Sequence, residues 1–188
     1  TLYLFHMAIY TKTGDRGGTK VFDKKTGQLT PVRKDSCHIR TIGTIDELNS
    51  FLGIVKFHFD DSNHRKIIEE VQGNLFTINS ILAGSKLKFS KTKTKKLEKQ
   101  IDIWEGELPV QKNFIYYGGT QRAAHLFYAR ALSRKAERSL VSYNSRFQIP
   151  DSILIYMNRL SDYLFMLGRS INFEAKVKEK FWKTGNST

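Results

Sequence analysis

Apolar residues recur every three or four positions along most of the chain, which is the spacing of one face of an α-helix. Polar or proline-containing segments divide this pattern into five stretches, at residues 42–59, 67–82, 97–104, 120–143 and 150–173. No stretch shows the convincing apolar–polar alternation of a β-strand. The pattern therefore predicts an all-α fold, a five-helix bundle over residues 40–173.

The two ends of the chain lack this helical spacing. Residues 8–38 are punctuated by glycines and a proline, so we interpret them as a loop-rich, extended N-terminal arm. Residues 176–188 are polar, and we expect them to form a frayed tail. A length of 188 residues suits a single domain that includes both the N-terminal arm and the C-terminal tail.

Cys37 is the only cysteine, so no disulfide forms within the chain and a reducing compartment is the natural setting. No apolar run reaches membrane-spanning length. The apolar start, Thr1–His6, lacks the basic region and cleavage site of a signal peptide. These features predict a cytoplasmic protein without a membrane partner.

The chain carries 31 Lys and Arg against 18 Asp and Glu, a net charge of +13. This excess fits nucleic acid, an anionic small molecule or a solvated lysine-rich surface. Seven lysines lie between Lys86 and Lys99 with almost no aromatic residue among them, which disfavours a base-stacking platform. We interpret this run as a solvated loop and helix face.

The arm contains the stretch TKTGDRGGTK at residues 11–20. Glycines let backbone amides converge on an anion, and hydroxyl and ammonium groups add donors and charge. The spacing fits neither a Walker loop nor a dinucleotide-binding fingerprint, so a plain turn and a phosphate site both remain open. The candidate phosphate ligands are Thr11, Lys12, Thr13, Gly14, Thr19, Lys20 and Lys34.

Three arginines and a glutamate share one face of the fourth predicted helix. Arg130, Arg134 and Arg138 follow at intervals of four residues, with Glu137 beside them. Guanidinium forks match phosphate oxygens and carboxylates, so this face suits a polyphosphate. The alternative is a solvated, salt-bridged surface. Lys135 points elsewhere, and we expect it to be a surface charge.

Asp46 borders the apolar side of the first predicted helix. A carboxylate there is costly unless a cation pairs with it, and Arg130 is a fitting partner. Alternatively, Asp46 and Glu47 simply favour the positive end of the helix dipole. The Asn158 amide is suited to hydrogen bonding with a nucleotide's sugar or base, but asparagine is also an ordinary helix residue. Taken alone, Phe114 is most simply interpreted as a core residue.

The order of the motifs is more specific than any one of them. In sequence they are YTKTGD (10–15), DELNS (46–50), FI (114–115), GGT (118–120), RKAER (134–138) and NRLSD (158–162). From residue 9 to about 169, the chain resembles the ATP:cob(I)alamin adenosyltransferases of the propanediol-utilisation type.

The resemblance implies a homotrimer of five-helix bundles with active sites between subunits. It implies that Asp46 and Arg130 pair across the interface and that Phe114 walls the lower face of the corrin. Arg130, Arg134, Arg138 and Asp46 are then the expected catalytic residues. The implied nucleotide ligands are Thr11, Lys12, Thr13, Gly14, Thr19, Lys34, Arg134, Glu137, Arg138 and Asn158, with Lys20 and Lys135 as further candidates.

The implied reaction transfers the 5′-deoxyadenosyl group of ATP to the cobalt of a reduced corrinoid, cob(I)alamin, releasing triphosphate and forming adenosylcobalamin. Mg²⁺ held mostly by phosphate oxygens is expected to assist. The implied protein partners are a flavin-dependent reductase and an adenosylcobalamin-dependent enzyme.

Two positions depart from the family pattern. Tyr116–Tyr117 replaces a more usual apolar residue and proline, and Lys135 replaces arginine, which keeps the charge but loses the bidentate fork. The main alternative function is a basic helical nucleic-acid-binding bundle without catalytic activity, and a second is a helical scaffold. The absence of a Glu-x-x-His pair disfavours a metal–carboxylate bundle.

Overall fold

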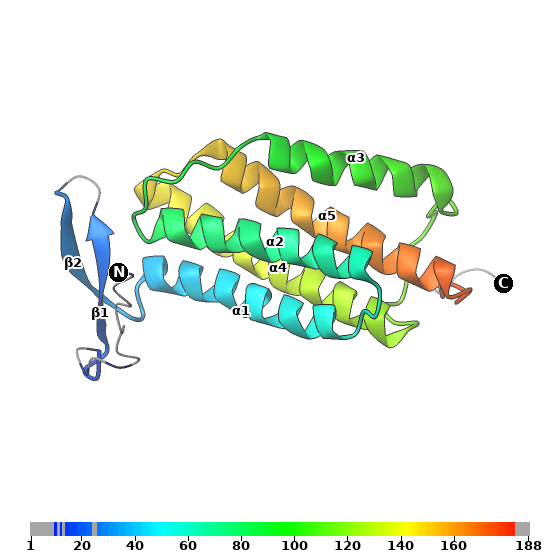
Figure 1. Ribbon diagram of the computed structural model, residues 1–188, viewed down its shortest axis with the longest axis horizontal. Coiled ribbons are helices and arrows are strands. Elements are labelled where there is room, and N and C mark those ends of the chain that lie inside the picture. Colours follow the sequence, from blue (N-terminus) through cyan, green and yellow to red (C-terminus); the bar gives the residue numbers. More distant parts are fainter. Residues whose placement is uncertain (1–9, 11, 13, 24–25, 183–188) are drawn as a thin grey trace, which may run out of the picture.

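The computed structural model describes residues 10, 12, 14–23 and 26–182, and five α-helices dominate this part of the chain (Figure 1). α1 spans Cys37–Phe57, α2 Ser62–Leu82, α3 Thr92–Glu107, α4 Gln121–Phe147 and α5 Asp151–Glu174. The predicted helical bundle is therefore confirmed.

The helices pack in an order that differs from their order along the chain. α4 lies between α1 and α5, α2 packs on α1, and α3 lies along α5 (Figure 1). Within the described ranges, none of the helices combines the length and the apolar character needed to span a bilayer.

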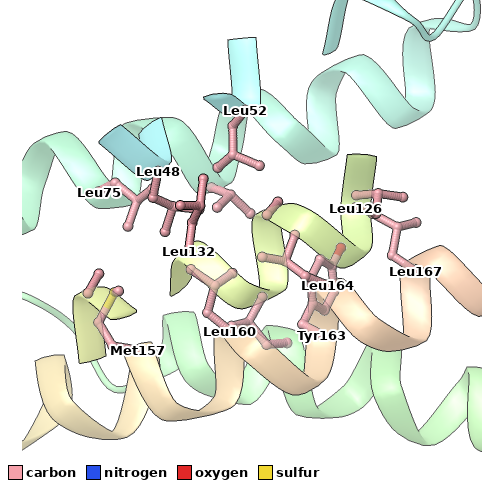
Figure 2. Packing of buried hydrophobic residues seen from close by; sticks show 14 of the residues in the cluster. Leu48, Leu52, Leu75, Leu126, Leu132, Met157, Leu160, Tyr163, Leu164 and Leu167 are labelled. Carbon is pink, nitrogen blue, oxygen red and sulfur yellow. The ribbon is translucent and has the colours of Figure 1, made fainter. Parts of the chain in front are cut away.

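The predicted apolar stripes meet in a single core (Figure 2). Leu48 and Leu52 of α1 face Leu132 of α4, and Leu160 and Leu164 of α5 lie on the other side of α4. All five side chains are buried. Because burying one such side chain stabilises the fold by about 1.5–3 kcal/mol, the stripes supply the main driving force for packing.

Side-chain caps set where several helices begin. Ser36 accepts a hydrogen bond from the backbone N–H of Ile39 at 3.3 Å, so α1 starts at Cys37, a few residues earlier than the expected bundle boundary. Thr120 caps α4 in the same way, through the backbone N–H of Ala123 at 3.1 Å. Both caps satisfy donors that lack a partner inside the helix.

The arm contains a β-hairpin that the sequence pattern did not predict. β1 (Gly18–Asp23) pairs with β2 (Gln28–Arg33) in antiparallel register. The strands agree with the extended and loop structure expected for the arm, but their pairing into a hairpin was not predicted. The hairpin lies at one end of the bundle (Figure 1) and most of its residues are exposed. Exposed strands need no strict apolar alternation, so the pattern gave no signal.

The segment after α5 is also more ordered than expected. The backbone N–H of Trp182 donates to the carbonyl of Phe114 at 2.7 Å, and Phe181 forms a β-bridge with Ile115. The frayed tail is therefore not observed over residues 176–182. A buried ion pair between Arg169 and Glu179, 2.6 Å apart, ties this segment to α5.

The lysine-rich run occupies the connection before α3 and the first turns of α3. Lys96 pairs with Glu70 at 2.8 Å, and the other lysines of the run mostly face solvent. The exposed members are Lys86, Lys88, Lys91, Lys95 and Lys99. The expectation of a solvated loop and helix face is confirmed.

Candidate functional site

The arginine face predicted on α4 is present. Arg134 and Arg138 are exposed and Arg130 is half-buried, while Ala136 and Leu140 of the same helix are buried in the core. Among the described residues, the three arginine side chains form no hydrogen bond or ion pair with a carboxylate. Their N–H donors are therefore available to an anion from outside the bundle.

Glu137 and Asn158 join the arginine face to α5. The side-chain amide of Asn158 donates a hydrogen bond to the Glu137 carboxylate at 2.8 Å. Glu137 is half-buried and Asn158 exposed. The pairing holds the one acidic group of this face away from a direct ion pair with the neighbouring arginines.

The glycine turn of the arm closes on Lys34. The ammonium of Lys34 donates to the carbonyl of Gly14 at 3.0 Å, and its backbone N–H donates to the carbonyl of Gly17 at 2.9 Å. A Cβ at Gly14 would lie 3.1 Å from the Lys34 Nζ, so a side chain there would crowd the ammonium. The glycine turn and Lys34, both candidate phosphate ligands, are thus adjacent in the structure.

The other candidate phosphate ligands of the arm are not gathered at the glycine turn. Thr11 and Thr13 lie outside the described residues, and Lys12 is exposed. Thr19 and Lys20 belong to β1, opposite Val32 and Pro31, rather than to the loop. Because successive strand residues point to opposite faces, the side chains of Thr19 and Lys20 lie on opposite faces of the hairpin.

The arm lies at the end of the bundle where α4 terminates, on the Arg138 side of the arginine face. The Thr41 hydroxyl of α1 donates a hydrogen bond to the carbonyl of Ser139 at 3.2 Å. The start of α1 therefore lies beside the part of α4 that carries Arg138. A hollow of about 530 Å³ separates the hairpin from this end and is lined in part by Tyr143. Burial, with the nearby Cys37, raises the pKa of Tyr143 and keeps its phenol neutral.

Phe114 lies on the surface. Its exposed fraction is 74%, so the simplest interpretation of it as core is wrong. It lines a hollow of about 370 Å³ with Lys112 and Trp182. An exposed aromatic face backed by an ordered segment suits contact with a flat apolar ligand.

Asn172 of α5 fixes the chain between Phe114 and α4. Its amide donates to the carbonyl of Gly118 and its oxygen accepts from the backbone N–H of Thr120, both at 2.9 Å. Gly119 between them has φ +98°, and a Cβ there would lie 2.3 Å from Asn172. Only glycine fits this close approach.

Asp46 and Arg130 do not meet within one chain. Glu47, next to Asp46, instead pairs with Lys135 of α4 at 2.6 Å. Lys135 thus behaves as the expected surface charge and is directed toward α1. Asp46 itself is exposed and forms no ion pair with any residue that the structure describes.

The described residues contain no group of three or more His, Cys, Asp or Glu side chains arranged to hold a metal ion. The donor set of the site consists of arginines, lysines, hydroxyls and one amide-paired carboxylate. Such a set suits an anion, and a divalent cation would enter with that anion.

The family model described as cobalamin adenosyltransferase matches residues 9–171. The chain belongs to this adenosyltransferase family. The corrinoid adenosyltransferase of Bacillus subtilis is 36% identical over 91% of the chain and 90% of its own length. Corrinoid adenosyltransferase PduO of Citrobacter freundii is 35% identical over 93% of the chain, which spans only 55% of that relative.

Solved adenosyltransferase structures share the fold. A variant of the PduO-type ATP:corrinoid adenosyltransferase from Lactobacillus reuteri, complexed with cobalamin and ATP, superposes with a TM-score of 0.87 at 33% identity. The alignment covers 94% of this chain and all of that one. A second variant, complexed with ATP, gives a TM-score of 0.84 at 34% identity.

From the sequence, Tyr117 was notable only as a departure from the family pattern, and several other residues around the candidate site were given no role. Tyr117 and Phe165 contact Arg130, Asn172 holds the Gly118–Thr120 turn, and Trp182 joins Phe114. The Gly118–Gly119 pair was the one local signal, since adjacent glycines indicate a close backbone approach. The other contacts join positions distant in sequence, which periodicity does not reveal.

Proposed function

We propose that this chain transfers the 5′-deoxyadenosyl group of ATP to the cobalt of reduced cobalamin, releasing triphosphate and forming adenosylcobalamin. Membership of the cobalamin adenosyltransferase family over residues 9–171 carries this proposal. The chain spans about half of some curated relatives, but it covers 90% of the B. subtilis relative and all of the complexed L. reuteri chain.

In the proposed reaction, reduced cobalt is the nucleophile. Its electron pair forms the cobalt–carbon bond to the 5′ carbon, while the carbon–oxygen bond breaks and its electrons leave with the triphosphate. No general base is required. The protein's task is to position the 5′ carbon and to stabilise the negative charge that develops on the triphosphate.

Arg134 and Arg138 are assigned the task of stabilising the negative charge that develops on the triphosphate. Their side chains are exposed and form no ion pair among the described residues, so no carboxylate has to be displaced when they bind phosphate. Lys34, which closes the glycine turn of the arm, is proposed as a third cation. Asn158, held by Glu137, lies where the nucleoside would extend toward α5.

Mg²⁺ is proposed to arrive with the triphosphate. The described residues offer no protein cage for it, whereas phosphate oxygens and water satisfy its octahedral preference. Glu137, next to Arg138 in the sequence, is the acidic residue of the arginine face and would be the carboxylate available to such an ion. When bound, the ion supplies further charge neutralisation for the leaving group.

Phe114 is proposed to lie against the lower face of the corrin. Its exposed ring and the hollow that it shares with Trp182 support this assignment. An apolar wall there keeps water and the axial base from the cobalt. Reduction then becomes easier, because the lower axial ligand that stabilises the oxidised metal is lost.

A head-to-tail homotrimer is proposed, with Asp46 of one chain meeting Arg130 of the next. The exposed face of α1 carries Ile54 and Phe57, exposed by 51% and 79%, and Asp46 lies about three turns before Phe57 on that face. In such a ring, a heterologous contact would join Asp46 of each chain to Arg130 of the next.

A flavin-dependent reductase that delivers the electron and an adenosylcobalamin-dependent enzyme that receives the product are the proposed partners. The proposed setting is the cytoplasm, which accords with the single, unpaired Cys37. Neither the family model nor the relatives support the alternative of a nucleic-acid-binding bundle.

The deciding experiment incubates the chain with ATP, Mg²⁺ and chemically reduced cobalamin and follows the absorption spectrum. We expect formation of the cobalt–carbon bond at a rate that requires protein, ATP and Mg²⁺ together. A chain that is folded and binds ATP but leaves the spectrum unchanged would contradict the proposal. Tight, steeply salt-dependent binding of duplex DNA would favour the alternative.

A further inference from the structure

Arg130 lies in an aromatic cradle. The carbon of its guanidinium is 5.2 Å from the centre of the Tyr117 ring and 5.4 Å from that of Phe165. The two rings come from different elements, Tyr117 from the segment before α4 and Phe165 from α5. Both distances are within the range at which a ring face attracts a cation.

Phe127 closes the base of this cradle. It is one turn before Arg130 on α4, is buried, and has its ring centre 5.3 Å from Tyr117 and 5.9 Å from Phe165. Gly168 of α5 makes room for it, because a Cβ there would lie 2.8 Å from the Phe127 ring. The cradle is thus a built feature of the α4–α5 contact.

The cradle holds Arg130 without using its hydrogen-bond donors. Within the described ranges, the Arg130 side chain donates to no carboxylate and no carbonyl, whereas Arg159 and Arg169 each bind a carboxylate. A guanidinium sandwiched by ring faces keeps its N–H groups directed outward at its edge. Such an arginine is oriented for an acceptor that the single chain lacks.

The backbone of Tyr117 is fixed on both sides. Before it, Tyr116 donates its N–H to the carbonyl of Lys180 at 2.8 Å. After it, Asn172 holds the Gly118 carbonyl. The Tyr117 ring is therefore set by the same ordered segment that presents Phe114.

From this geometry we propose that Tyr117 and Phe165 are positioning residues that orient Arg130 toward the carboxylate of Asp46 of the partner subunit. The inference rests on the homotrimer proposed above and gives two residues of this chain a role in its assembly. It also makes the Phe114 segment part of the assembly contact, since Tyr117 belongs to that segment.

The test measures the dissociation constant of the assembly, without ATP or corrinoid, for wild type, Tyr117→Leu, Asp46→Asn and the double variant. We expect Tyr117→Leu to weaken assembly by about 2- to 30-fold, the range of a cation–π contact. In the Asp46→Asn background, Tyr117→Leu should change the dissociation constant by less than about twofold, because the oriented Arg130 guanidinium then has no carboxylate to bind. Tyr117→Phe keeps the ring and should restore wild-type assembly.

Tyr116→Leu is the matched control. Tyr116 and Tyr117 are adjacent and equally exposed, at 55% and 56%, but the Tyr116 ring faces Lys180 instead, at 5.4 Å. Any effect of Tyr116→Leu should add to that of Asp46→Asn. Phe165 is less suitable for the test because it also packs against the core.

Wild-type assembly of Tyr117→Leu, full additivity with Asp46→Asn, a loss in Tyr117→Phe as large as in Tyr117→Leu, or a monomeric wild type would each overturn the inference. Adenosylation by the wild type is assayed in parallel. An active wild type with additive effects rejects the positioning role alone, whereas predicted coupling in an inactive wild type rejects the proposed reaction alone.

Discussion

The side-chain amide of Asn158 donates a hydrogen bond to the carboxylate of Glu137 at 2.8 Å, and this contact joins two motifs that are 21 positions apart in the chain. It crosses from α5 to α4 beside Arg134 and Arg138. The predicted nucleotide ligands of the two helices therefore belong to one surface, and the predictions below follow from that arrangement.

Arg134→Ala and Arg138→Ala should each lower kcat/KM strongly while the fold stays intact. Each substitution removes a charge-assisted phosphate contact, which should cost about 2–4 kcal/mol of transition-state stabilisation. Both side chains are exposed, so thermal unfolding should change little. Arg146→Ala, an exposed arginine later on the same helix, controls for the loss of charge. Wild-type kinetics in both variants would refute the site assignment.

Asp46→Ala and Arg130→Ala should weaken assembly and show strong coupling. Neither residue has a carboxylate or cation partner among the described residues, so the proposed pair would form between chains. Removing one partner of a buried ion pair should cost about 3–5 kcal/mol. The measurement is a double-mutant cycle on the assembly's dissociation constant. Independent, additive effects would show that the two residues do not pair.

Phe114→Ala should lower turnover strongly with a nearly unchanged KM for ATP. Because Phe114 is 74% exposed, its truncation leaves no core cavity, and the free energy of unfolding should change by only about 0.5 kcal/mol. The fraction of four-coordinate cobalt, measured spectroscopically, should fall. Phe76→Ala, another exposed phenylalanine at 61% on α2, is the control. Unchanged coordination in a folded Phe114→Ala variant would mean that the ring does not wall the corrin.

Glu179→Ala should destabilise the fold by about 3–5 kcal/mol, because it leaves the Arg169 guanidinium buried without its counter-charge. Arg169 is 5% exposed and bonds to both Glu179 oxygens, at 2.6 and 3.0 Å, and to the Pro109 carbonyl at 2.8 Å. Chemical denaturation measures the loss.

Glu174→Ala is the control for this substitution, since Glu174 is an exposed acid at the end of α5. We expect it to change the free energy of unfolding by less than about 0.5 kcal/mol. Equal losses in Glu174→Ala and Glu179→Ala would show that the Arg169 pair has no special role.

The sequence by itself determined the helices and the arginine face. The period of three to four along Leu48, Leu52 and Val55 is a local property, and so is the interval of four between Arg130, Arg134 and Arg138. A helix converts such intervals into a shared face without any knowledge of its neighbours. The order of the motifs likewise indicated the adenosyltransferase family, which the family model confirms.

Only the tertiary structure decided which residues meet. The exposed hairpin has no strict apolar alternation, so its antiparallel pairing could not be predicted from the pattern and is seen only in the structure. Phe114 is apolar yet exposed because residues 180–182 pair with its backbone and leave the ring outside. The Arg130–Phe165 contact exists only because α4 and α5 pack against each other. Contacts between distant positions form through packing, and packing leaves no periodic trace in a single chain.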